Sequence, residues 1–126
     1  YQETSYIIKK KILKIIGILI KELINSDEQV IQIIIPLNFM EDFVQILYAN
    51  DYNDNRKLFN RFIGTIVSLL RKKVDYNPPD VFWIQFEESG GVSILEDILH
   101  GEEQVFAIRA ELFFKNIYSL RPVCNS

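Results

Sequence analysis

Apolar residues recur along this chain at the spacing of one helix face. In the first stretch the apolar residues are Ile8, Ile12, Ile15, Ile16, Leu19 and Leu23. Intervals of three and four residues are typical of an amphipathic helix. Thr4 and Ser5 are suitable N-caps for this helix, and Asn25-Ser26 is a suitable stop. The pattern therefore predicts one long helix between these limits.

Two shorter helices are predicted next. The first fits residues 27–35, with Ser26 as its N-cap and acidic residues in its first turn, where the helix dipole favours negative charge. Pro36 and Asn38 are expected to break this helix. The second fits residues 40–49, and the turn-forming residues that follow it predict a loop.

The rest of the chain predicts four more helices. A long one fits residues 56–73, and the loop after it ends at Pro79, which is well placed to start a short helix. Residues 87–118 then contain two apolar-faced helices joined by a short charged turn. Every apolar run has the helical period and none alternates, so the predicted fold class is all-α, with about seven helices.

The pattern repeats after 52 residues. Seven apolar positions fall on seven others at this shift: Val30 on Phe82, Ile31 on Trp83, Ile34 on Phe86, Met40 on Val92, Phe43 on Leu95, Ile46 on Ile98 and Leu47 on Leu99. The repeated unit is a short helix, a turn, a helix, a loop and a long helix. Three-helix units of about 40 to 47 residues are typical of armadillo repeats, which stack into a solenoid.

This repetition predicts the organisation of the chain as a right-handed superhelical solenoid of about two and a half armadillo repeats. Residues 1–25 are the last helix of a truncated repeat, residues 26–73 form one repeat, and residues 79–120 form the final one. Gly90 and Gly91 stand where the short helix turns into the next, and Asn38 stands at the matching position of the preceding repeat. Glycine and asparagine tolerate the positive φ of a helix end, so we expect a structural turn there.

Charge is distributed unevenly. Residues 1–73 hold 11 Lys and Arg against 8 Asp and Glu, whereas residues 74–126 hold 3 against 9. The basic residues do not interleave with exposed aromatic residues or form a known motif, so nucleic acid is not an expected partner. The acidic half predicts a partner-binding acidic edge, for which a solvated acidic face is the alternative. The residues of this edge are Glu87, Glu88, Glu96, Asp97, Glu102 and Glu103.

Other classes of function find little support. The run Ile12–Ile24 is too short to cross a bilayer and contains charges, so no membrane partner is expected. The single cysteine, Cys124, fits a reducing compartment. His100 has no accompanying nucleophile or carboxylate and is interpreted as a helix-end residue, and Trp83 as a packing residue. Phosphate-loop, dinucleotide and zinc motifs are absent, so no enzyme activity, cofactor or metal is predicted.

Two stretches carry a family resemblance. The first, FEESGGVSILEDILHGEEQVF with ELFFKNIYSL after it, has an acidic pair, Gly-Gly, an apolar helix ending near His, glutamates and a Val-aromatic pair. The second, SDEQVIQIIIPLNFMEDFVQIL, begins with a Glu-Gln-Val start and continues into an apolar helix. Together they resemble the last armadillo repeats of the importin-α nuclear import adaptors, over about residues 9–118.

The resemblance also indicates where cargo would bind. Importin-α grooves use Trp-Ala-x-x-Asn in the third helix of a repeat, where the tryptophan packs on a lysine stem and the asparagine holds the peptide backbone. At the matching positions this chain has Lys14 and Ile18, and then Gly64 and Ser68. The family's last two repeats also lack this ladder, so Gly64 and Ser68 fit their assignment. Lys14 and Ile18 depart from the pattern.

The resemblance implies a function in nuclear transport. The whole protein would carry basic-signal cargo with an importin-β-like carrier, would be recycled by an export receptor with Ran, and would work in both cytoplasm and nucleus. An armadillo or HEAT scaffold without a transport role is the alternative, and a helical accessory domain of an enzyme is a third. A basic autoinhibitory segment upstream of this sequence would distinguish the first two.

Overall fold

The computed structural model describes residues 2–23, 28–48, 56–72 and 74–121. Over these residues the chain is helical and contains no strand, which confirms the predicted all-α class. The helices are α1 (Gln2–Leu23), α2 (Glu28–Leu37), α3 (Phe39–Tyr48), α4 (Arg56–Arg71), α5 (Val81–Glu88), α6 (Gly91–Leu99) and α7 (Gln104–Asn116). A short 3₁₀ helix, η2 (Tyr118–Leu120), follows α7.

Several predicted helix ends are wrong. α1 already begins at Gln2, so Thr4 and Ser5 lie inside the helix and do not cap it. α2 continues through Pro36 to Leu37, and Asn38, the other predicted breaker, follows its end. α5 begins at Val81 with Asp80 as its N-cap, so Pro79 precedes the cap. The predicted stop at Asn25-Ser26, the Ser26 cap, the loop at 50–55 and Cys124 lie outside the described residues.

Two three-helix units follow each other along the chain. Adding 52 to the bounds of α2 and α3 gives 80–89 and 91–100, and the observed α5 and α6 span 81–88 and 91–99. The turns correspond as well, because Asn38 has φ 51° and Gly90 has φ 83°. All fourteen apolar residues matched at this shift are buried or half-buried. The 52-residue repetition is therefore one of backbone and burial as well as of sequence.

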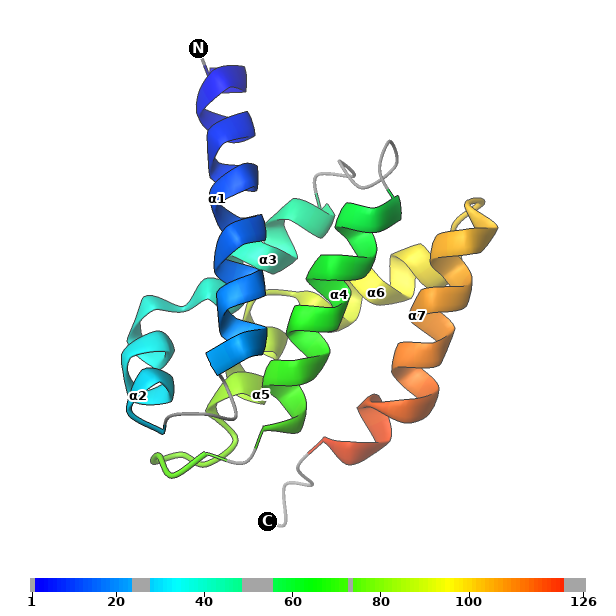
Figure 1. The fold of residues 1–126 in the computed structure, drawn as a ribbon. Helices are drawn as coiled ribbons and strands as arrows, with labels where there is room; N and C mark the ends of the chain where they lie inside the picture. Colours follow the sequence, from blue (N-terminus) through cyan, green and yellow to red (C-terminus); the bar gives the residue numbers. More distant parts are fainter. Residues whose placement is uncertain (1, 24–27, 49–55, 73, 122–126) are drawn as a thin grey trace.

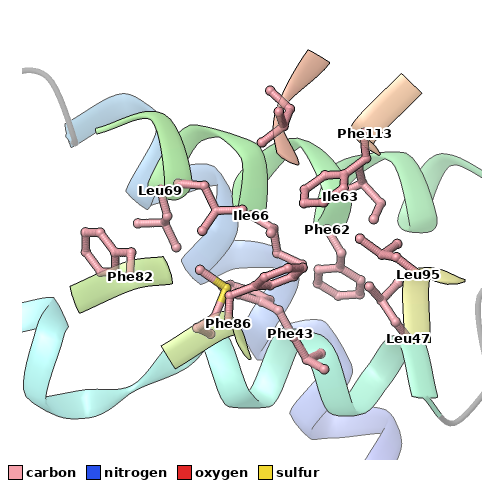
Figure 2. Packing of buried hydrophobic residues seen from close by; sticks show 14 of the residues in the cluster. Phe43, Leu47, Phe62, Ile63, Ile66, Leu69, Phe82, Phe86, Leu95 and Phe113 are labelled. Carbon is pink, nitrogen blue, oxygen red and sulfur yellow. The ribbon is translucent and has the colours of Figure 1, made fainter. Parts of the chain in front are cut away.

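A continuous apolar core joins the two units (Figure 2). Phe43 of α3 lies against Phe62 of α4, with ring centroids 5.6 Å apart. Phe86 of α5 packs against Phe113 of α7 at 5.5 Å. A Cβ at Gly91 would overlap the ring of Phe86, so the α5–α6 turn needs glycine for space at this position.

The long helices lie side by side. In Figure 1, α1, α4 and α7 run in similar directions, and α3 and α6 cross behind them. α1 packs on α4, and a Cβ at Gly17 of α1 would come within 3.0 Å of Thr65 Oγ1 of α4. α4 meets α7 through the Phe59 and Phe106 rings, whose centroids are 4.7 Å apart. Each successive segment thus adds one long helix to the same layer.

Side-chain donors connect the two units across their boundary. The buried indole Nε1 of Trp83 in α5 donates to the Leu70 carbonyl at the end of α4, over 3.0 Å. Gln85 Nε2 donates to the Ile35 carbonyl in α2, over 2.9 Å. Both carbonyls lie in the last turns of their helices, where backbone oxygens lack intrahelical partners, and the Ile35 oxygen also accepts from the Asn38 N–H over 3.2 Å. Trp83 is a packing residue, as expected, and its ring also lies against Tyr118.

Candidate protein-interaction surfaces

The acidic edge consists of two groups at opposite ends of α6. Glu87 and Glu88 lie in the last turn of α5, just before α6 begins. The other four residues lie at the far end: Glu96 and Asp97 in the last turn of α6, Glu102 in the turn after it and Glu103 at the N-cap of α7. All six side chains are exposed. The length of α6, about 1.5 Å per residue, separates the two groups.

Four of the six carboxylates do not stabilise the helices that carry them, whereas Glu102 and Glu103 precede α7, where the helix dipole favours negative charge. The C-terminal end of a helix has a partial negative charge and favours cations. The last turns of α5 and α6 contain no basic residue, and they carry Glu87, Glu88, Glu96 and Asp97. The charge is therefore placed where it opposes the helix dipole, and helix stability does not account for it.

The predicted cargo positions lie along the contact between α1 and α4. There a small hollow of about 40 Å³ is lined by Lys14, Gly17, Ile18, Lys21, Arg61, Phe62 and Thr65; we call it the α1–α4 hollow. Gly64 and Ser68 lie on α4, half-buried. Lys21 reaches across to α4, since a Cβ at Gly64 would lie 2.6 Å from its Nζ.

The polar groups on the α4 side are already used within the helix. Thr65 Oγ1 donates to the Arg61 carbonyl and Ser68 Oγ donates to the Gly64 carbonyl, each over 2.9 Å. Neither hydroxyl can donate to a bound peptide without breaking its bond to the helix. The hollow therefore offers cationic side chains and one exposed aliphatic residue, Ile18, in place of an indole and an amide.

A larger pocket lies elsewhere and was not predicted. A cavity of about 790 Å³ opens where the end of α4 meets the start of α5. It is lined by Leu70, Arg71, Lys72, Val74, Pro79, Asp80, Trp83 and Leu120. The indole N–H of Trp83 is bound to Leu70, so this tryptophan presents only its carbon face. The lining residues come from the end of α4, from residues 79–83 and from η2. In the sequence, only the proline turn and the tryptophan indicated that this region was unusual.

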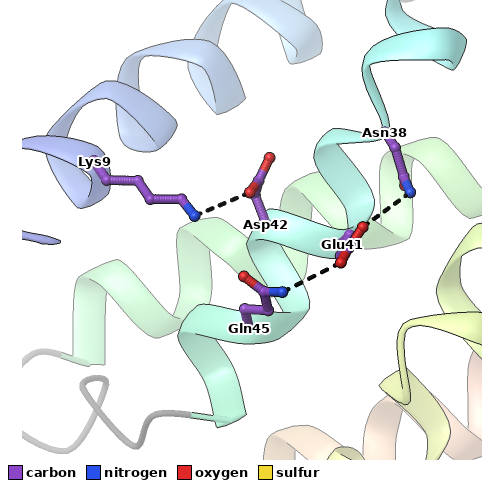
Figure 3. Close-up of polar contacts among 5 residues, drawn as sticks. All are labelled: Lys9, Asn38, Glu41, Asp42 and Gln45. Atoms are coloured by element: carbon purple, nitrogen blue, oxygen red, sulfur yellow. Dashed lines mark hydrogen bonds and ion pairs between the residues drawn. The ribbon is translucent and has the colours of Figure 1, made fainter.

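A second open surface lies along α1. The apolar residues Ile8, Ile12, Ile15 and Leu19 are about half exposed and follow one stripe of the helix. Beside this stripe, Lys9 Nζ of α1 lies 3.2 Å from Asp42 Oδ1 of α3 (Figure 3). Glu41, one residue before Asp42, accepts hydrogen bonds from Asn38 and Gln45, each over 3.3 Å. α3 thus has a polar, ordered first turn next to an uncovered apolar stripe.

Chemistry-bearing residues do not converge in the described part of the chain. His100 is the exposed C-cap of α6, the helix-end position that the sequence predicted. Within residues 2–23, 28–48, 56–72 and 74–121, no three His, Cys, Asp or Glu side chains lie close enough to hold a metal ion. No single described helix is long and apolar enough to cross a membrane. α2 with α3 meets that test only as a pair bent by 51°.

No protein-family model, curated protein or solved structure matches this chain. The resemblance to importin-α therefore depends on the residues quoted for it, and the function is argued from the repeated units and their exposed surfaces.

Proposed function

We propose that this chain is an armadillo-type segment of a protein-interaction solenoid, and that the protein is an importin-α-like nuclear import adaptor. The observation that carries the proposal is the recurrence after 52 residues of two helices, their buried positions and a left-handed turn residue, Asn38 in one unit and Gly90 in the next. Recurring units that pack on their neighbours are the defining feature of solenoids.

The uncovered stripe of α1 supports the stacking part of the proposal. A helical repeat cannot bury its apolar face alone and depends on the adjacent repeat for it. Ile8, Ile12, Ile15 and Leu19 present such a face on α1, the helix assigned to a truncated repeat. A preceding unit stacked on α1 would cover these side chains in the way that α4 covers the other side of the same helix.

The acidic edge supports the transport part. Its six exposed carboxylates lie at the ends of α5 and α6 and in the turn before α7, in the unit that resembles the last importin-α repeat. In this proposal the edge meets a basic surface of an export receptor bound to Ran. The full-length protein carries basic-signal cargo with an importin-β-like carrier, and it moves between cytoplasm and nucleus.

One observation favours the alternative of an armadillo or HEAT scaffold without a transport role. The α1–α4 hollow carries Lys14, Lys21 and Arg61, which would repel a lysine-rich cargo signal. These charges disfavour an ordinary minor cargo groove in this segment, and a transport role would then depend on cargo sites in other repeats of the full-length protein.

Capture of the full-length protein separates the two functions. Immobilised export receptor loaded with Ran in its GTP state should retain an importin-α-like protein, and an immobilised basic signal peptide should retain it as well. A scaffold would be folded and helical and yet be retained by neither. Failure of both captures with a protein whose circular dichroism is helical would exclude the transport role and leave the scaffold.

A further inference from the structure

We propose that the α1–α4 hollow binds an acidic peptide segment of a partner protein. This inference depends on two packed helices and their charges, and it does not depend on the transport role. The binding groups are the side chains of Lys14 and Lys21 from α1 and of Arg61 from α4, which line the same hollow.

One of these cations lies directly over α4. Lys21 extends over Gly64, and an added Cβ at this glycine would lie 2.6 Å from the lysine Nζ and 3.3 Å from its Cε. Glycine in the middle of α4 is less favourable than alanine, because glycine loses more backbone conformational entropy when the helix forms. At this glycine the head of Lys21 lies against the backbone of α4, in space that a larger residue would occupy.

These cations lack partners within the fold. The lining of the hollow contains no Asp or Glu. Within the described residues Lys14, Lys21 and Arg61 form no ion pair, whereas Lys9 of the same helix α1 pairs with Asp42. Like charges gathered at one site oppose folding, and an anionic ligand removes that repulsion. Complementary charge therefore predicts a ligand rich in Asp and Glu.

Several features favour a short acidic peptide over nucleic acid. Single-stranded nucleic acid is bound by exposed aromatic rings on which bases stack. The aromatic residue of the hollow, Phe62, is only 1% exposed, and Ile18 supplies an exposed aliphatic contact. Residues 74–126 carry 3 basic against 9 acidic residues, so a long polyanion would be repelled by the rest of the chain. A short segment would meet only the local positive charge.

The test measures fluorescence anisotropy of a labelled peptide of about twelve residues, rich in Glu and Ser, with the 126-residue chain at low and moderate salt. The wild type should bind this peptide, and the double change Lys14→Gln and Lys21→Gln should weaken binding about tenfold, equivalent to about 1.4 kcal/mol. Lys115→Gln, an exposed lysine of α7 outside the hollow, is the control and should bind as the wild type does.

A second variant separates binding from folding. Gly64→Ala leaves the net charge unchanged and displaces the head of Lys21, so it should weaken binding several-fold while the thermal midpoint stays the same or rises. Absence of binding by the folded wild type would overturn the proposal, as would equal weakening by Lys115→Gln. Tighter binding of a twelve-nucleotide single strand, or of vesicles containing anionic lipid, would assign the cations to that ligand and also overturn it.

Discussion

Asn38 and Gly90 adopt the same left-handed backbone conformation at matching turns, although their side chains differ. Each lies between two consecutive short helices, with φ 51° and 83° respectively. Asparagine reaches this region because its short polar side chain bonds locally, and Asn38 Nδ2 does donate to Glu41 Oε2 over 3.3 Å. Glycine reaches it without a steric penalty. The second unit needs no polar partner at this position, because its backbone alone makes the turn.

At the same scale, replacing Gly90 should be costly for a reason unrelated to packing. A Cβ built at Gly90 meets nothing within 4 Å, so only the backbone conformation resists substitution. Gly90→Ala should therefore lower the free energy of unfolding by about 1–2 kcal/mol. Gly90→Asn should cost less, since Asn38 occupies the matching position. Urea denaturation of the two variants checks this, and an equal loss for both would contradict the left-handed turn.

Trp83 provides a second test at the residue scale. Its buried Nε1 donates to the Leu70 carbonyl over 3.0 Å, and phenylalanine would fill most of the same space without donating. Trp83→Phe should lower the free energy of unfolding by about 1–3 kcal/mol, because the carbonyl loses its partner. Leu120→Ala, an exposed change at the same pocket, is the control and should cost little. If Trp83→Phe left the free energy of unfolding unchanged within experimental error, a water molecule would have to donate to the Leu70 carbonyl in place of the indole.

At the scale of the elements, the helices were predictable and several of their ends were not. Every predicted helix exists because each has a side that must be buried, and burial follows the helical period. Thr4 and Ser5 were predicted as caps, but these residue types also fit inside a first turn, and α1 simply begins earlier. Pro36 and Asn38 were both expected to end α2; the helix runs through Pro36, and the positive φ of Asn38 redirects the chain.

The surfaces were harder to predict than the helices. The exposure of the acidic residues follows from their polarity. Their division into two groups follows from α6, which lies between Glu88 and the residues after it and separates the two groups along its length. The 790 Å³ cavity is built from the end of α4, the proline turn and the start of α5, which are consecutive, and from η2, which lies far from them in sequence. Lys21 of α1 also lies over Gly64 of α4, a contact between two helices that are distant in sequence. Periodicity predicts which face is buried, but it does not predict which segment will lie opposite.

At the scale of the whole molecule, the charge of the α1–α4 hollow leads to a prediction about cargo. A lysine-rich signal peptide needs apolar walls for its lysine stems and amides for its backbone, and the hollow offers neither. Lys14, Lys21 and Arg61 add repulsion. We expect this chain to bind such a peptide no better than about millimolar, about −4 kcal/mol. Micromolar binding in a calorimetric titration would place a cargo groove elsewhere on the chain.

The acidic edge leads to the last prediction, which concerns capture by the export receptor with Ran. The side chains of Glu102 and Glu103 are exposed between α6 and α7, and the Glu103 side chain makes no capping hydrogen bond to α7. Reversing both to lysine should leave the free energy of unfolding nearly unchanged, since surface substitutions usually cost within about 0.5 kcal/mol. Capture should weaken, most of all at low ionic strength, because such charges set association rate and partner choice and are screened by salt.

The control for this experiment is a charge reversal outside the acidic edge. Glu111 is an exposed residue of α7, and Glu111→Lys changes the net charge as much as Glu102→Lys does. If total charge alone governed capture, the two single variants would weaken it equally. A specific acidic edge predicts that Glu102→Lys weakens capture more, that the double variant weakens it further, and that raising the salt concentration removes the difference. Unchanged capture by the double variant at low salt would mean that these carboxylates are a solvated surface.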